Sequence, residues 1–225
     1  MAVDIARRQL LVLAVLPDMS SFFEALKPVP DSYSEWFRAV QADDDRKLQQ
    51  LLARGFDPNT LEPERYDTAL ILAVRNNAKK VFALLMTTPS LNLDTRSKNG
   101  DTALMIAAFG SNVLFATELI ERGAEINRPG WTALHYAAAA GCDAIVKILL
   151  ENAAYIDAES PNKTTPLMMA VRGTHLATVQ LLLDEGADAT LKNELGLSAI
   201  DIAEAQSSQQ IISVLRNFAR SQAGN

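Results

Sequence analysis

The 225-residue sequence predicts an all-α fold, a solenoid of about six helix-turn-helix units joined by β-hairpin-like turns. One observation behind this prediction is a threonine or serine anchor that recurs in steps of 34, 30, 33 and 33 residues. The anchors are Thr68, Thr102, Thr132, Thr165 and Ser198. A second observation is that a leucine follows every anchor at a fixed distance of seventeen residues, while the connectors between units vary in length. Constant helical parts and variable loops are typical of a repeat array.

Each unit contains the pattern of two short antiparallel helices. Small and apolar residues follow the anchor, as in "ALHYAAA" after Thr132, and their alanines allow close helix packing. A break such as Asn77 or Gly141 follows, and then an apolar face at helical spacing predicts the second helix. Glycines at Gly123 and Gly186 end that second helix, because glycine tolerates a positive φ.

The domain organisation follows from the repeat. Counting back seventeen residues from Leu51 reaches Ser34, so the segment "SEWFRAVQADDDRKLQQLLARGFDPN" is a degenerate first unit. We expect an N-terminal segment over residues 1–30, a repeat domain over 31–220 with units starting near 34, 68, 102, 132, 165 and 198, and a tail over 221–225. Polar second helices in the first and last units are expected of caps that close a solenoid.

Two of the units resemble a known repeat family. The stretches "TALHYAAAAG…IVKILLENAAYID" and "TTPLMMAVRGTHLATVQLLLDEGADAT" resemble the ankyrin repeat, with its Thr-Pro-Leu-His opening, its Gly-Ala-Asp stop and its 33-residue period. The resemblance extends from Tyr33 to about Phe218, although alanine replaces the proline at Ala69, Ala103 and Ala133. The block "INRPGWTALHYAAA…IDAESPNKTTPLMMA" also resembles proteobacterial ankyrin proteins, many of which are exported to the periplasm.

Composition narrows the classes of partner. Hydrophobic residues make up 48% and charged residues 21% of the chain, which is typical of a globular protein. The net charge of −6 argues against bulk affinity for nucleic acid or for an anionic membrane. No segment approaches the roughly 18 apolar residues that a membrane span needs. A single cysteine, Cys142, cannot form an internal disulfide.

The N-terminal segment leaves the location of the protein open. The basic pair Arg7-Arg8 precedes an apolar run from Leu10 to Leu16, which is the order of a secretory signal. Asp4 and Pro17 depart from that pattern. The segment is therefore either a cleaved signal, which makes the protein periplasmic, or an amphipathic helix packed on the first repeat of a cytoplasmic protein.

No pattern indicates an enzyme or a bound cofactor. His135, His175 and Cys142 belong to separate helices and lack the spacing of a zinc site, and no glycine-rich phosphate loop occurs. We expect His135 to tie its turn together by hydrogen bonds. The sequence therefore predicts no catalytic, metal or cofactor site.

The resemblance to ankyrin repeats implies a concave groove lined by the turn tips and by the ends of the first helices. This register predicts a basic and aromatic groove, diluted by Glu64, Asp67 and Asp101. Its candidate residues are Arg65, Tyr66, Arg75, Asn76, Lys98, Phe109, Arg128, Trp131, Asn162, Lys163 and Arg172. Arginine and aromatic enrichment is expected of a binding surface, so the implied partner is another protein, offering an acidic or extended segment.

Alternatives remain for these residues and for the function. Exposed cations on turns are usually solvated, and Phe109 could equally pack on a neighbouring helix. Trp131 lies beside a connector that is three residues short, so it either fills the resulting gap or anchors a ligand.

The expected function is non-enzymatic protein binding. The resemblance to exported proteins implies, as an alternative, a periplasmic accessory protein that supports an envelope enzyme or a stress response.

Overall fold

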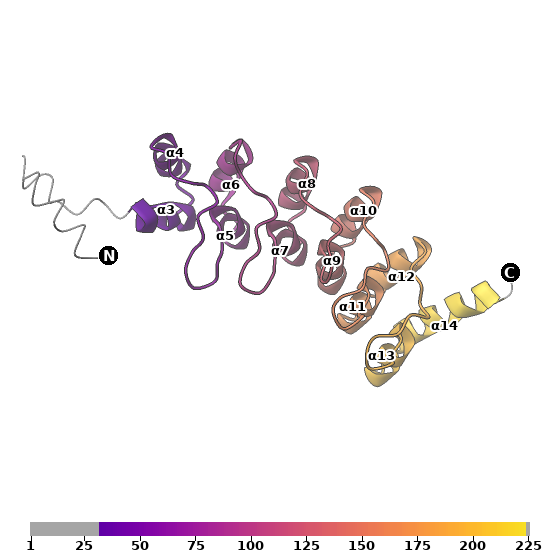
Figure 1. The fold of residues 1–225 in the computed structure, drawn as a ribbon. Coiled ribbons are helices and arrows are strands. Elements are labelled where there is room, and N and C mark those ends of the chain that lie inside the picture. Colours follow the sequence, from indigo (N-terminus) through magenta and orange to yellow (C-terminus); the bar gives the residue numbers. More distant parts are fainter. Residues whose placement is uncertain (1–31, 224–225) are drawn as a thin grey trace, which may run out of the picture.

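The computed structural model describes residues 32–223, and within this range it forms two parallel rows of helices along an elongated array (Figure 1). The inner row consists of α3 (Ser32–Gln41), α5 (Ala69–Arg75), α7 (Ala103–Phe109), α9 (Ala133–Ala140), α11 (Pro166–Arg172) and α13 (Ala199–Ala205). The outer row consists of α4 (Asp45–Ala53), α6 (Lys79–Met86), α8 (Val113–Glu121), α10 (Asp143–Glu151), α12 (Leu176–Asp184) and α14 (Gln209–Ala223). The predicted all-α solenoid of six helix pairs is confirmed.

The anchor residues begin the inner helices. Thr68, Thr102, Thr165 and Ser198 each stand immediately before an inner helix and accept the amide hydrogen of the residue three positions later, at 3.3 to 3.5 Å. Such a bond satisfies an amide that has no partner within the helix. Ser34 differs, because it lies inside α3 rather than before it.

The turn between the two helices of each unit has the same backbone conformation throughout. Nine residues after each anchor the chain adopts a positive φ, between 52° and 71°. These residues are Asp43, Asn77, Ser111, Gly141, Thr174 and Ser207. The breaks expected at Asn77 and Gly141 are confirmed, and Asp43 shows that the first unit keeps the register counted from Ser34.

Adjacent units are held together by apolar packing between equivalent helices. In the inner row, alanines such as Ala107 and Ala138 are fully buried, which lets α7, α9 and α11 approach closely. In the outer row, the rings of Phe82 and Phe115 stack with their centroids 3.9 Å apart. Each fully buried aromatic side chain contributes about 2 to 3 kcal/mol. Stability therefore resides in the interfaces between neighbours.

One arginine adds a polar link between units. The guanidinium of Arg122, just after α8, donates to the carbonyl oxygens of Leu85 at 3.1 Å, of Met86, and of Thr88 at 2.5 Å. These carbonyls lie at the end of α6, where the last turn of a helix has acceptors without partners. Arg122 thus takes the place of the glycine stop that the second unit lacks.

The connectors close as hydrogen-bonded turns, and no regular strand is assigned between residues 32 and 223. Ser97, Ser160 and Asn193 each donate an amide hydrogen to the carbonyl four residues later, at 2.9 to 3.1 Å. Neighbouring tips are also joined: the Lys98 amide donates to the Arg65 carbonyl at 2.7 Å, and the Glu194 amide to the Asn162 carbonyl at 3.1 Å.

The third connector, over residues 126–131, lacks both kinds of bond within the described part of the chain. It is four residues shorter than the preceding connector and three shorter than the following one, so it has neither the residues to close a four-residue turn nor the length to reach the next tip. The row of tips is therefore interrupted at this place.

The two ends of the chain lie outside the regular repeats. The N-terminal segment 1–30, with the possible signal peptide, lies outside the described residues. Helix α14 continues to Ala223 and so extends into the segment 221–225 that the sequence marks as a tail. Between residues 32 and 223, no helix has both the length and the apolar character needed to cross a bilayer.

Candidate functional site

The ends of the inner helices form a row of equivalent positions seven residues after each anchor. From the second unit onward this row reads Arg75, Phe109, Ala139, Arg172 and Ala205. Phe109 is 62% exposed, and Arg172 is exposed without an ion pair to any other described residue. Two arginines therefore bracket an apolar pair along the inner face of the array.

A hollow of about 230 Å³ opens beside this apolar pair. We refer to it as the aromatic pocket; it is lined by Phe109, Trp131, His135, Tyr136, Ala139 and Met169. Its walls come from α7, α9 and α11 and from the tip of the short connector, so it lies where inner helices and tips meet. The small side chain of Ala139 leaves the space that arginine and phenylalanine occupy at the equivalent position of other units.

Edge-to-face ring contacts fix the aromatic walls. The Phe109 ring meets the Tyr136 ring at 83° with centroids 6.1 Å apart, and the Trp131 ring meets the His135 ring at 75° with centroids 5.2 Å apart. Such arrangements are favourable for aromatic pairs. Trp131 thus packs on His135 while the pocket beside it stays open, so the indole does not fill the whole gap left by the short connector.

His135 is a fully buried structural link between two units. The amide hydrogen of Thr132 is donated to His135 Nδ1 at 3.2 Å, and Nε2 lies 2.9 Å from the carbonyl oxygen of Thr164 in the next unit. Because a carbonyl can only accept, Nε2 carries the hydrogen and the ring is neutral. Burial lowers the pKa of His135, which favours that neutral form. The expected role in tying the turn is confirmed.

Tyr136 connects the aromatic pocket to the charged part of the groove. Its hydroxyl donates to Asp101 Oδ1 at 2.5 Å. Burial, followed by this bond to a carboxylate, raises the pKa of Tyr136, while the positive charge of Arg75 acts in the opposite direction. Tyr136 thus links the aromatic pocket on α9 to Asp101 at the start of the third unit.

A second, smaller hollow of about 150 Å³ carries the basic residues of the first two tips. We refer to it as the basic pocket; it is lined by Arg65, Asp67, Arg75, Ser97, Lys98 and Asn99. Arg75 Nε lies 3.1 Å from Oδ2 of the fully buried Asp67. Three cations therefore face one carboxylate, and the pocket keeps a net positive charge.

Other candidates from the sequence lie at the tips or directly after an inner helix, and their side chains differ in availability. Tyr66 is 47% exposed, and Asn76, the cap residue after α5, and Lys163 are also exposed. The side chain of Asn162 already accepts a hydrogen bond from the Ser160 hydroxyl at 2.6 Å.

The side chain of Arg128 contacts residues of its own and the preceding connector. Its side chain is 14% exposed; Nη1 donates to the Asp94 carbonyl at 3.0 Å, and Nε lies 3.2 Å from a Glu125 carboxylate oxygen. These contacts hold the short connector against its neighbour, so most of the guanidinium is engaged within the chain.

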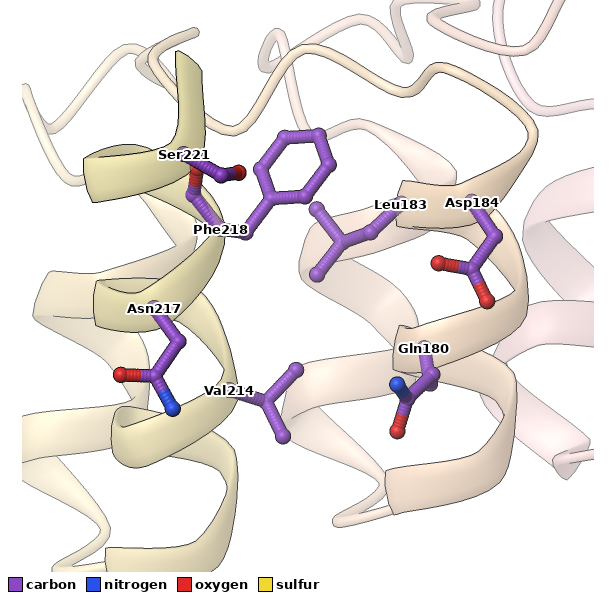
Figure 2. Close-up of a pocket in the computed structure, with 7 residues that line it drawn as sticks. All are labelled: Gln180, Leu183, Asp184, Val214, Asn217, Phe218 and Ser221. Atoms are coloured by element: carbon purple, nitrogen blue, oxygen red, sulfur yellow. The ribbon is translucent and has the colours of Figure 1, made fainter. Parts of the chain in front are cut away.

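A further hollow, of about 290 Å³, lies between α12 and α14 at the C-terminal end (Figure 2). Phe218 of α14 faces Leu183 of α12, Val214 lies opposite Gln180, and polar residues such as Asn217 and Asp184 flank them. This is the surface cleft between two neighbouring outer helices. It carries no concentration of charge or aromatic rings and lies on the other row from the predicted groove.

Sequence reasoning missed three residues of the aromatic pocket: Tyr136, Ala139 and Met169. Tyr136 and Met169 each stand four residues after an anchor, one turn before the helix end, so the periodicity that located Phe109 could also have located them. No group of three or more histidine, cysteine or acidic side chains that could hold a metal ion occurs between residues 32 and 223.

Comparisons with known proteins identify the repeat. A family model described as ankyrin repeats (3 copies) matches residues 36–129, 91–160 and 116–193. The chain is 31% identical over 160 residues to human SH3 and multiple ankyrin repeat domains protein 2, covering 69% of this chain and 9% of that protein. It is 29% identical over 197 residues to Protein glp-1 of Caenorhabditis elegans, covering 80% of this chain and 15% of that protein.

A solved structure shares the fold. The crystal structure of human ASB11 ankyrin repeat domain matches with a TM-score of 0.71 at 23% sequence identity, covering 80% of this chain and 81% of that chain. At this identity the likeness concerns the fold alone. The present chain spans only a small part of the length of both curated relatives.

Proposed function

Because this chain belongs to the ankyrin-repeat family, we propose that it is a non-enzymatic protein that binds an acidic, extended segment of another protein along its inner face. Ankyrin repeats are protein interaction modules, and the same stack serves many partners, so the surface must identify the ligand. The observation that carries the proposal is the row of helix ends and tips, where Arg65, Arg75, Lys98 and Arg172 lie on a chain of net charge −6.

Electrostatics give the proposal its selectivity. A basic strip attracts negatively charged segments, which raises the rate of encounter with acidic partners. Exposed single charges contribute little, about 0.2 to 1 kcal/mol each. Affinity must therefore come from several contacts at once.

The test uses the full-length chain as bait to isolate its partner and then measures the affinity of that partner for charge variants. We expect Lys98→Glu and Arg172→Glu each to weaken binding by about fivefold and to reduce its salt dependence. Arg75 is better changed to glutamine, because a glutamate there would face the buried Asp67. Lys147→Glu, an exposed lysine on the outer helix α10, is the matched control. Equal affinity of all variants would contradict binding at the inner face.

A periplasmic accessory role is an alternative that rests on the basic pair and apolar run at the N-terminus. The relatives reported above come from animals, so they give no support to the resemblance to exported proteobacterial proteins. Cell fractionation and N-terminal sequencing separate the two locations: a processed chain in the periplasm favours this role, and an unprocessed chain in the cytosol excludes it.

A further inference from the structure

We propose that the aromatic pocket receives one large apolar side chain of the partner. Acidic residues of the partner lie on both sides of that side chain. On one side they contact Arg75 and the rest of the basic pocket, and on the other side they contact Arg172. This inference rests on the proposed function and adds to it the pattern of the partner. The geometry assigns an acidic, apolar, acidic order with unequal spacing.

The walls of the pocket determine the chemistry of the central side chain. Phe109, Trp131 and Met169 present apolar surface, and Asp101, which is bonded to the pocket residue Tyr136, already accepts its hydroxyl hydrogen. His135 offers no free nitrogen, since Nδ1 and Nε2 are bonded to Thr132 and Thr164. A polar guest would lose its water without gaining a partner, whereas an apolar guest would cover an exposed Phe109.

The charges at both ends argue against a cationic guest. Aromatic rings can bind a lysine or arginine through their faces. Here, however, Arg75 and Arg172 stand on either side of the pocket along the same row of helix ends, and Lys98 and Arg65 add to the positive charge near Arg75. The surrounding field therefore disfavours a cation in the pocket and favours carboxylates beside it.

The spacing of the inner helices sets the spacing of the partner residues. Adjacent packed helices lie about 9 Å apart, and an extended chain advances about 3.3 Å per residue. The pocket is centred on α9, one helix from Arg172 on α11 and two helices from Arg75 on α5. An extended partner would thus carry one carboxylate about three residues from the apolar side chain and the other about five or six residues away on the opposite side.

The interrupted row of tips explains why the recess occurs in this unit. Elsewhere a tip closes on itself and bonds to its neighbour, as Lys98 does to Arg65. The short connector does neither, and Ala139 provides no bulk at the helix end. Both features open the inner face at the same place, so the aromatic pocket is the position at which one side chain of the partner can be inserted.

The experiment selects peptides of about 16 random residues, displayed on phage, against the full-length chain. We expect the retained peptides to share a large apolar residue with acidic residues at the unequal spacing given above. Synthetic versions should quench or shift the fluorescence of Trp131; the other tryptophan, Trp36, is fully buried in the first unit.

Two substitutions at equivalent positions then separate the pocket from the rest of the groove. Ala139→Leu fills the pocket and should weaken peptide binding by about tenfold or more. Ala205→Leu makes the same change at the exposed end of α13, outside the pocket, and should leave binding unchanged. Arg172→Glu should weaken peptide binding whether or not the pocket receives an apolar side chain, because it tests the charged rim and not the pocket.

The outcomes distinguish this inference from the proposed function. Acidic peptides that lose affinity with Arg172→Glu but not with Ala139→Leu would overturn the apolar anchor and leave the basic groove standing. A lysine or arginine enriched at the central position would also overturn it. Peptides insensitive to all three variants, or a library from which nothing is retained, would count against both proposals.

Discussion

Replacement of His135 tests the link between the fourth and fifth units most directly. Within its own turn, the fully buried ring meets the Thr132 amide at 3.2 Å and the Thr132 hydroxyl at 2.9 Å through Nδ1, and its Nε2 bonds to the Thr164 carbonyl of the next unit. In His135→Ala, the Thr132 amide loses its acceptor and the buried ring leaves a cavity. A buried amide without a partner costs about 1 to 3 kcal/mol, and with the lost packing we expect a total of about 3 kcal/mol.

Methionine at the same position provides a graded control. The equivalent residue of the third unit is Met105, whose sulfur accepts the Thr102 amide hydrogen at 3.5 Å. His135→Met should therefore keep the volume and a weak acceptor for the amide, and lose the contact with the Thr132 hydroxyl and the bond to the Thr164 carbonyl. That carbonyl still accepts the Ser160 amide at 3.1 Å, so the expected cost is about 1 kcal/mol.

The assay is urea unfolding of both variants, followed by far-ultraviolet circular dichroism and by tryptophan emission. Because units contact only their neighbours, a weak central interface can also split one transition into two. The reasoning is wrong if His135→Ala costs less than about 1 kcal/mol, or if the methionine variant is as unstable as the alanine variant.

Two further predictions concern the interfaces. Burial lowers the pKa of His135 in the folded state below the ordinary value of 6.5, so the unfolded chain binds the proton first; stability is fully present above pH 6.5 and declines as the pH falls toward the folded pKa. Urea titrations between about pH 7 and pH 5 should show a smaller decline in His135→Met than in the natural chain. Arg122→Ala should reduce the free energy of unfolding by about 2 kcal/mol, because three carbonyl oxygens at the end of α6 lose a charged donor, and Arg122→Lys should restore only part of it. Thermal unfolding would contradict this role if alanine and arginine gave the same midpoint.

The fold was predictable because every unit repeats the same residue types at the same positions. The anchor, the positive φ nine residues later and the leucine after seventeen residues recur, so one well-formed unit determines the register of a weak one. Ser34 shows the limit of this reasoning: the count places it correctly, yet α3 has already begun at Ser32. A helix boundary depends on local hydrogen bonds that the period does not specify.

The site was predictable in position and less so in the state of its side chains. Register placed Phe109 and Arg172 on the inner face, where they are exposed. It could not show that Arg128 is engaged by Asp94 and Glu125, or that Arg75 pairs with Asp67, because the period does not specify side-chain orientation. Charge partners across units depend on loop length, which is the part of the sequence that varies.

The short third connector changes the groove without changing the packing of the helices. Its missing residues leave the helices α7 and α9 in register, because packing between the inner helices fixes their positions independently of the tips. What changes is the edge of the groove, where Trp131 occupies the position that Asp67, Asp101 and Thr164 occupy in other units. A deletion that the packed helices tolerate thus alters only the inner face, and it places an indole, a phenylalanine and an open recess between two arginines.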